Sequence, residues 1–323
     1  MEEEKYIVAS NCIFVKGYKN NLLFDIQKRC WYHITFSLSP VDLTKIDTDS
    51  IEYMVSEGIL LKVPKSLESL LPPISLEYDS PYLIESAIID RSETSEYSIE
   101  KVVHLLDSLS VKFLQVRYYS DIDIEELELL LNYLFESTIE SIQLVCPYKK
   151  DLLEYIKSNN LFSRNPKLSN IIFSSCSDNI VDDYANIAFT SEIINSSDNC
   201  GNIHPNLFSN NPKLFFKSLN FNSCLHKKIG IDEKGFLKNC PTMQNSFCHI
   251  DDASDYNIKQ LKTSFWSITK DQVNICKDCE FRYICTDCRV ITDSPENIYS
   301  RPLKCGYNPY ISKSGKEKRN IIL

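Results

Sequence analysis

Four cysteines fall within thirteen residues in the last quarter of the chain, in the stretch CKDCEFRYICTDC at residues 276–288. They are Cys276, Cys279, Cys285 and Cys288, and their spacing is C-x2-C-x5-C-x2-C. Two residues between cysteines let both thiolates reach one metal from a tight backbone turn, as in zinc and iron–sulfur sites. Two such pairs in tandem therefore indicate metal ligation, but they do not decide between iron and zinc.

More cysteines flank the tandem pairs: Cys200, Cys224, Cys240, Cys248 and Cys305. Four ligands complete one site and eight complete two, so this part of the chain has enough thiols for two centres. Zinc stays open as an alternative to iron–sulfur clusters, because tetrahedral all-cysteine sites suit zinc equally well. We interpret the remaining four cysteines as ordinary buried thiols: Cys12, Cys30, Cys146 and Cys176.

The composition points to a cytoplasmic protein. The 323 residues carry a formal net charge of −9, which argues against a non-specific nucleic-acid binder. The N-terminus MEEEKYIVAS lacks the features of a signal peptide, and the richest apolar run, LELLLNYLF, is too short to cross a bilayer. We therefore expect neither a nucleic-acid nor a membrane partner, and we expect the thiols to stay reduced.

A longer pattern surrounds the tandem pairs. Cys224, Gly235 and Cys240 form C-x10-G-x4-C within NSCLHKKIGIDEKGFLKNCPTM, and Cys305 follows in PLKCGYNPY. Together with C-x2-C-x5-C, this pattern resembles the SPASM domain, the auxiliary iron–sulfur domain of peptide-modifying radical SAM proteins. The stretches KNCPTM, CKDCEFRYICTDCR and KCGYNPY are similar to the peptide maturases of grasp-with-spasm systems. The chain departs from the usual pattern in one spacing, with two residues instead of three between the fifth and sixth cysteines.

The resemblance implies two four-iron clusters with separate ligands. The first ligand set would be Cys276, Cys279, Cys285 and Cys305. The second ligand set would be Cys224, Cys240 and Cys288, with Cys200 as the fourth ligand. Cys248 is the competitor for that fourth position, and an open iron site is a further alternative.

One element of radical SAM enzymes is missing from the sequence. Those enzymes anchor their catalytic cluster on C-x3-C-x2-C in an early loop, and this chain contains no such triplet. Without three closely spaced thiolates, cleavage of S-adenosylmethionine has no anchor. We therefore do not expect radical SAM chemistry from this chain, and whether it is an enzyme stays open.

The elements that must position these cysteines predict an α/β protein of three parts. Residues 1–90 are β-rich, with two strands joined near 17–21, then a helix ending at Gly58 and another strand, which predicts a winged-helix-like module. This module resembles the leader-recognition elements of peptide-modifying systems, and a purely structural cap on the sheet domain stays open as the alternative. In residues 91–199, helices at 97–109, 124–137 and 149–162 alternate with strands at 111–119, 139–147 and 168–176. About four strands in this alternation predict a partial βα barrel, without the cluster motif, or a small parallel sheet. Residues 200–323 are loop-rich and form the SPASM-like domain, with one helical segment at 253–265.

Three functions remain in view. The first is maturation of a ribosomally synthesised peptide, in which the chain binds the precursor's leader, carries two [4Fe-4S] clusters and works with an ATP-grasp ligase, as the resemblance implies. The second is an iron–sulfur oxidoreductase or electron-transfer protein. The third is a zinc-stabilised adaptor without a redox role.

Overall fold

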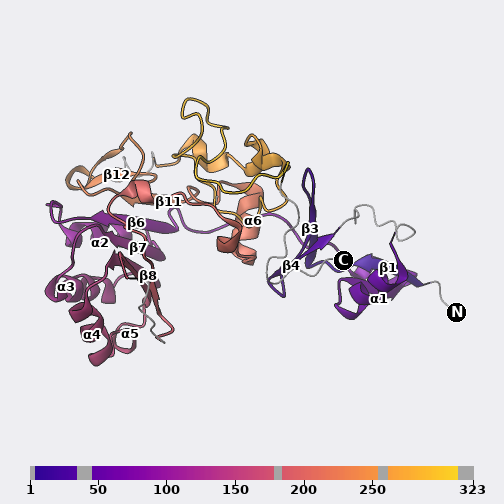
Figure 1. Cartoon of the computed structure of the whole chain (residues 1–323), viewed down its shortest axis with the longest axis horizontal. Helices are drawn as coiled ribbons and strands as arrows, with labels where there is room; N and C mark the ends of the chain where they lie inside the picture. The colour runs from indigo at the N-terminus through magenta and orange to yellow at the C-terminus, as the bar shows by residue number, and fades with distance from the viewer. Residues whose placement is uncertain (1–3, 35–45, 178–183, 254–260, 312–323) are drawn as a thin grey trace. The chain divides into compact units, whose positions relative to one another are not determined.

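The computed structural model describes residues 4–34, 46–177, 184–253 and 261–311 (Figure 1). Contacts group the chain into two compact units, each assembled from segments that are distant in sequence. Unit 1 contains Met1–Asp79, Asn202–Cys224 and Ser267–Leu323, and unit 2 contains Ser80–Gly201 and Leu225–Trp266. The first change of unit lies among the prolines Pro72, Pro73 and Pro81. The division at 1–90, 91–199 and 200–323 remains a prediction.

Unit 2 is built on a large, mostly parallel sheet with the strand order β10-β9-β8-β7-β6-β11-β12-β13. Neighbours from β10 to β11 pair in parallel, whereas β11, β12 and β13 pair antiparallel. The strands are β6 (Ser86–Arg91), β7 (Phe113–Tyr118), β8 (Ser141–Pro147), β9 (Leu168–Ser174), β10 (Ile187–Phe189), β11 (Lys228–Ile231), β12 (Phe236–Lys238) and β13 (Cys248–His249). The α/β class is therefore confirmed.

The helices of unit 2 are α2 (Ile99–Ser108), α3 (Ile124–Phe135), α4 (Lys150–Ser158) and the short α5 (Leu161–Arg164). Successive strands from β6 to β9 take successive places in the sheet, so right-handed crossovers put the helices on one side of it (Figure 1). Helix α3 buries the stripe Leu127, Leu130, Leu131 and Leu134, as its period predicts. Phe135, the last residue of the helix, is instead 60% exposed although it is apolar.

The sheet is larger than the sequence alternation predicts. Strand β6 falls at the predicted boundary near residue 90, and β11 comes from the last third of the chain. Strand β11 has only the four residues KIGI, too few to show a strand period. It pairs with β6, which lies some 140 residues earlier in the sequence, and local periodicity does not predict a pairing between such distant segments. Gly230 in this strand is required by close packing, because a Cβ there would come within 2.4 Å of Pro241.

Unit 1 contains two small antiparallel sheets. Strands β1 (Glu4–Val8) and β5 (Leu60–Pro64) form one, and β2 (Cys12–Lys16), β3 (Asn21–Asp25) and β4 (Cys30–Ile34) form the other. The predicted hairpin is confirmed, and β4 adds a third strand to it. Helix α1 (Thr48–Ser56) is capped by the Asp47 side chain and followed by Gly58 with φ of 68°, which confirms the predicted helix stop.

The central strand β3 is buried on both faces. Leu23 packs into an apolar cluster with Met54 of α1, whereas Leu22 and Phe24 pack into a second one that includes Phe281. The second cluster, which we call the shared apolar cluster, consists of Val15, Leu22, Phe24, Ile26, Phe215, Phe281, Tyr283 and Ile284. It joins the N-terminal strands to the cysteine-rich segment within one core. Phe215 comes from α6 (Pro212–Asn220), a helix that the sequence analysis missed although Asn211 caps it and Pro212 begins it.

The remaining helices are short 3-10 segments: Lys65–Leu70, Ser197–Asn199, Pro205–Leu207, Ile250–Asp252, Ser264–Ser267, Lys270–Gln272 and Cys276–Asp278. Between residues 261 and 311 the described helices are all of this kind. The helical segment predicted at 253–265 lies mostly outside the described residues. In the described residues, no helix has the length and apolar character needed to span a membrane.

Candidate metal centre

The first ligand set comes together in unit 1. Cys276, Cys279, Cys285 and Cys305 all line one cavity, so residues up to 29 positions apart in sequence share one wall. The other lining residues are Phe208, Lys270, Ile275, Arg282, Arg301, Tyr307 and Pro309. Four thiols, three basic side chains and a mainly apolar remainder therefore surround this space.

The backbone explains how these thiols converge. The 3-10 turn Cys276–Asp278 ends with the Cys279 amide donating to the Cys276 carbonyl oxygen at 3.0 Å, which folds the C-x2-C pair into a knuckle. Ile275, just before the turn, has φ of 68°, a strained value for a β-branched residue. Cys305 lies on a separate segment near the C-terminal end of the described chain. Two backbone hydrogen bonds hold this segment against Ile203: the Ile203 amide donates to the Lys304 carbonyl at 3.1 Å, and the Gly306 amide donates to the Ile203 carbonyl at 3.0 Å.

Burial controls the protonation of these thiols. It raises the pKa of Cys276 to about 12 and the pKa of Cys279 well above its ordinary value. Burial also raises the pKa of Cys285, although the neighbouring Lys270 ammonium opposes this shift. Without a bound cation these three thiols thus stay neutral, and a metal that binds them must displace their protons.

Aromatic side chains cover the cavity on the side of the shared apolar cluster. The Phe281 ring contacts Trp31, Phe208 and Tyr307, with ring centroids 6.3, 5.3 and 5.2 Å away. The Tyr307 hydroxyl donates to Glu280 Oε1 at 2.6 Å, which fixes the ring against the cavity. Phe208 and Tyr307 themselves line the cavity, and Phe281 connects them to Trp31 of β4.

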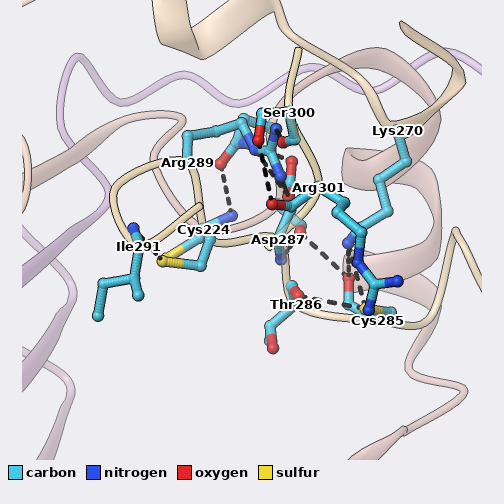
Figure 2. Close-up of polar contacts among 12 residues, drawn as sticks. Cys224, Lys270, Cys285, Thr286, Asp287, Arg289, Ile291, Ser300 and Arg301 are labelled. Carbon is cyan, nitrogen blue, oxygen red and sulfur yellow. Dashed lines mark hydrogen bonds and ion pairs between the residues drawn. The ribbon is translucent and has the colours of Figure 1, made fainter. Parts of the chain in front are cut away.

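A buried polar network holds the segment that carries Cys285 and Cys288 (Figure 2). Asp287 is 1% exposed and accepts from Asn222 Nδ2 at 2.7 Å and from Arg289 Nε at 2.9 Å. Arg289 in turn donates to the Ser300 carbonyl oxygen at 2.5 Å. The side-chain oxygen of Asn222 accepts from the Cys224 amide at 3.0 Å. Asp287 thus ties the segment of Cys285 and Cys288, one cysteine from each ligand set, to the loop of Cys224.

The second ligand set is divided between the units. Cys224 and Cys288 belong to unit 1, where both are half-buried and the Ile291 amide donates to Cys288 Sγ at 3.3 Å. Cys240, which is buried, and Cys200, which is exposed, belong to unit 2. There the Thr242 hydroxyl donates to the Ser197 carbonyl at 3.1 Å and links the segments that carry these two cysteines. Within the described ranges, no three His, Cys, Asp or Glu side chains converge as closely as a single metal ion requires.

The other cysteines lie in the folded cores. Cys12 and Cys146 are buried, and burial raises the pKa of each thiol to about 12. Cys176 is also buried, and its thiol donates to the Phe173 carbonyl at 3.3 Å. Cys30 is half-buried on β4. Three of the four cysteines are therefore buried thiols as predicted, whereas Cys30 is only half-buried.

Three polar residues of this centre were missed in the sequence: Lys270, Asp287 and Arg289. Asp287 could have been noticed in the sequence because it lies between Cys285 and Cys288. A charged side chain between two ligands must either point to solvent or bind a partner of opposite charge. Nothing in the local sequence marks Lys270, which lies 15 residues before Cys285.

Comparison with known proteins adds little. No protein-family model matches this chain, and no curated protein matches it. Two solved structures resemble it weakly: the crystal structure of SuiB from Streptococcus suis and that of SuiB bound to S-adenosylmethionine. Their TM-scores are 0.34 and 0.33 at 12% identity, covering 93% of this chain and 100% of the other. Scores this low carry no argument, so the candidate centre stands on its own cysteines.

Proposed function

We propose that this protein is an iron–sulfur protein that takes part in the maturation of a ribosomally synthesised peptide. It would carry two [4Fe-4S] clusters, bind the precursor through its N-terminal region and work with an ATP-grasp ligase. The observation that carries the proposal is the single cavity lined by Cys276, Cys279, Cys285 and Cys305.

The environment of these thiols favours a cluster over isolated thiols. A four-iron cluster takes one thiolate at each iron, so its ligands surround a volume, which suits four cysteines around one cavity. A cluster with four thiolates is a net anion, and the cavity wall supplies the buried Lys270 ammonium, together with Arg282 and Arg301, which already pair with Asp271 and Asp293. Such a cluster, when bound, would accept or donate one electron at a time.

An absorption spectrum with metal analysis tests this proposal. Protein purified without oxygen should show a broad visible charge-transfer band and should contain iron and inorganic sulfide. Zinc in place of iron, with no visible band, would instead favour the zinc-stabilised adaptor.

We propose Cys200 as the fourth ligand of the second set. The Thr242–Ser197 hydrogen bond ties the segment of Cys240 to the residues just before Cys200, whereas Cys248 is engaged in β13 as the register partner of Leu237. Cys200→Ala should therefore lower the iron content, and the matched variant Cys248→Ala should retain it. Iron analysis of the two purified variants decides between them, and loss of iron in Cys248→Ala alone would reverse the assignment.

We propose that the N-terminal strands of unit 1 bind the leader of the precursor as an added strand. Strand β3 lies between β2 and β4 and has no free edge, so the proposed leader strand would pair with another strand of unit 1. Lys16 and Lys19 are exposed on the β2–β3 hairpin, whereas Lys28 is already paired with Glu57 at 2.7 Å. Lys16 and Lys19 are therefore the basic residues that an acidic leader would meet.

Titration calorimetry with the full-length chain tests this step. Residues 1–90 alone are unsuitable, because the shared apolar cluster includes Phe215 and Phe281 from outside that range. Lys16→Glu with Lys19→Glu should weaken leader binding, and added salt should weaken binding to the unmodified chain, since exposed charges are screened beyond about 10 Å at 0.1 M. Lys150→Glu, an exposed lysine of α4 in unit 2, is the control and should bind the leader normally. Equal binding by all three chains would remove the hairpin from leader recognition.

A further inference from the structure

Lys270 lies almost completely inside unit 1, beside one of the proposed ligands. Its side chain belongs to the cavity wall, and the residue is 3% exposed. The ammonium donates to the Cys285 carbonyl oxygen at 3.0 Å and to Cys285 Sγ at 3.2 Å. The cation therefore contacts the sulfur atom of Cys285 (Figure 2), a residue that lines the cavity.

Burial of this ammonium demands a compensating negative charge. Lysine is almost never fully buried unless it is paired, because the charged form loses its hydration. The other cations of the cavity wall have carboxylate partners: Arg282 pairs with Asp271 at 2.8 Å and Arg301 with Asp293 at 3.5 Å. For Lys270, both hydrogen-bond acceptors belong to Cys285, and the nearby Asp287 carboxylate, which also favours the ammonium, is already bound by Arg289 and Asn222. Its position fits an anionic sulfur centre in the cavity.

We propose that Lys270 raises the reduction potential of the cluster bound by Cys285, through a charge-assisted N–H···S bond to that ligand. The inference rests on the proposed function, since it requires a cluster in the cavity. Hydrogen bonds to the sulfurs and nearby charge are among the determinants of cluster potential. Reduction adds one electron and breaks no bond, so the fixed positive charge stabilises the reduced form more than the oxidised form.

Spectroelectrochemistry of the anaerobically purified, full-length protein measures this effect, with an electrode as the electron source. Lys270→Met keeps the length of the side chain and removes the charge. At the wild-type midpoint potential, its ratio of reduced to oxidised cluster should fall about tenfold, or about 59 mV for a one-electron couple. Lys270→Arg keeps the charge and should return the potential toward the wild-type value. Of the two clusters, only the one bound by Cys285 should change its midpoint potential.

Lys277→Met is the matched control. Lys277 lies between Cys276 and Cys279 in sequence but is exposed, so the same loss of charge is screened by water and should shift the potential much less. An unchanged potential in Lys270→Met, or an equal shift in Lys277→Met, would overturn the inference while leaving the cluster assignment standing. Absence of any cluster in the wild-type protein would overturn both.

A second measurement covers the case in which Lys270→Met does not retain its cluster. Wild-type protein labelled with ¹⁵N at the lysine Nζ atoms should show a ¹⁵N hyperfine coupling to the reduced cluster in pulsed electron paramagnetic resonance. The coupling should disappear in labelled Lys270→Arg. A wild-type spectrum without this coupling would exclude the N–H···S bond.

Discussion

Replacing Cys279 with alanine should remove one cluster and leave the other, so the iron content should fall by about half. Cys279 belongs to the knuckle that begins the first ligand set and packs against the shared apolar cluster. In the segment around it, the described helices are short 3-10 turns, so the bound cluster should contribute much of the local stability. Residues 270–310 should therefore become sensitive to limited proteolysis in the variant, which iron analysis and peptide mapping will measure together.

Cys30→Ala is the matched control for this experiment. Cys30 is also a half-buried cysteine of unit 1, but it lies on β4 and outside the cavity lining. Its replacement should leave both the iron content and the cleavage pattern unchanged. Full iron in Cys279→Ala would remove Cys279 from the ligands, and equal losses in both variants would point to general unfolding of unit 1.

Replacing Asp287 with alanine should destabilise unit 1 by about 3–5 kcal/mol, the usual cost of leaving a buried charge without its partner. The side chains of Asp287 and Arg289 are 1% and 0% exposed, and Arg289 Nη2 lies 2.8 Å from Asp287 Oδ1. In the variant the buried Arg289 guanidinium would lose its carboxylate partner. Asn222, which accepts from the Cys224 amide, would also lose its hydrogen bond to Asp287. Denaturant unfolding of the apo protein should show the loss of stability, and reconstitution should show weaker iron uptake.

Two further variants identify the cause. Asp271 also pairs with an arginine, but its side chain is 44% exposed, so Asp271→Asn should cost less than about 1 kcal/mol. Replacing both Asp287 and Arg289 with leucine should cost less than Asp287→Ala, because no unpaired charge remains buried. If the double variant is the less stable of the two, the ion pair itself contributes net stability and the stranded charge is not the main cost.

The sequence by itself determined the local features of this protein. The leucine period of residues 124–135 defined α3, and the run FLQVRY defined β7, because an apolar face at a fixed period is a local property. The same holds for Gly58 after α1, where a positive φ favours glycine. The spacing of Cys276, Cys279 and Cys285 also indicated the candidate centre, since a ligand knuckle requires only a few residues.

Tertiary structure decided what depends on contacts between distant segments. Strand β11 joins β6 far across the sequence, and β3 has apolar side chains on both faces because one face covers α1 and the other packs on Phe281. The local periodicity of the sequence predicts neither the pairing of β11 with β6 nor the packing on both faces of β3. In the sequence nothing distinguishes Lys270 from an exposed surface lysine. It is buried only because the turn that carries it packs against Cys285. Burial depends on how the whole core packs, which a local sequence pattern does not define. Because Lys270 is buried, its ammonium loses water and hydrogen-bonds to Cys285 instead.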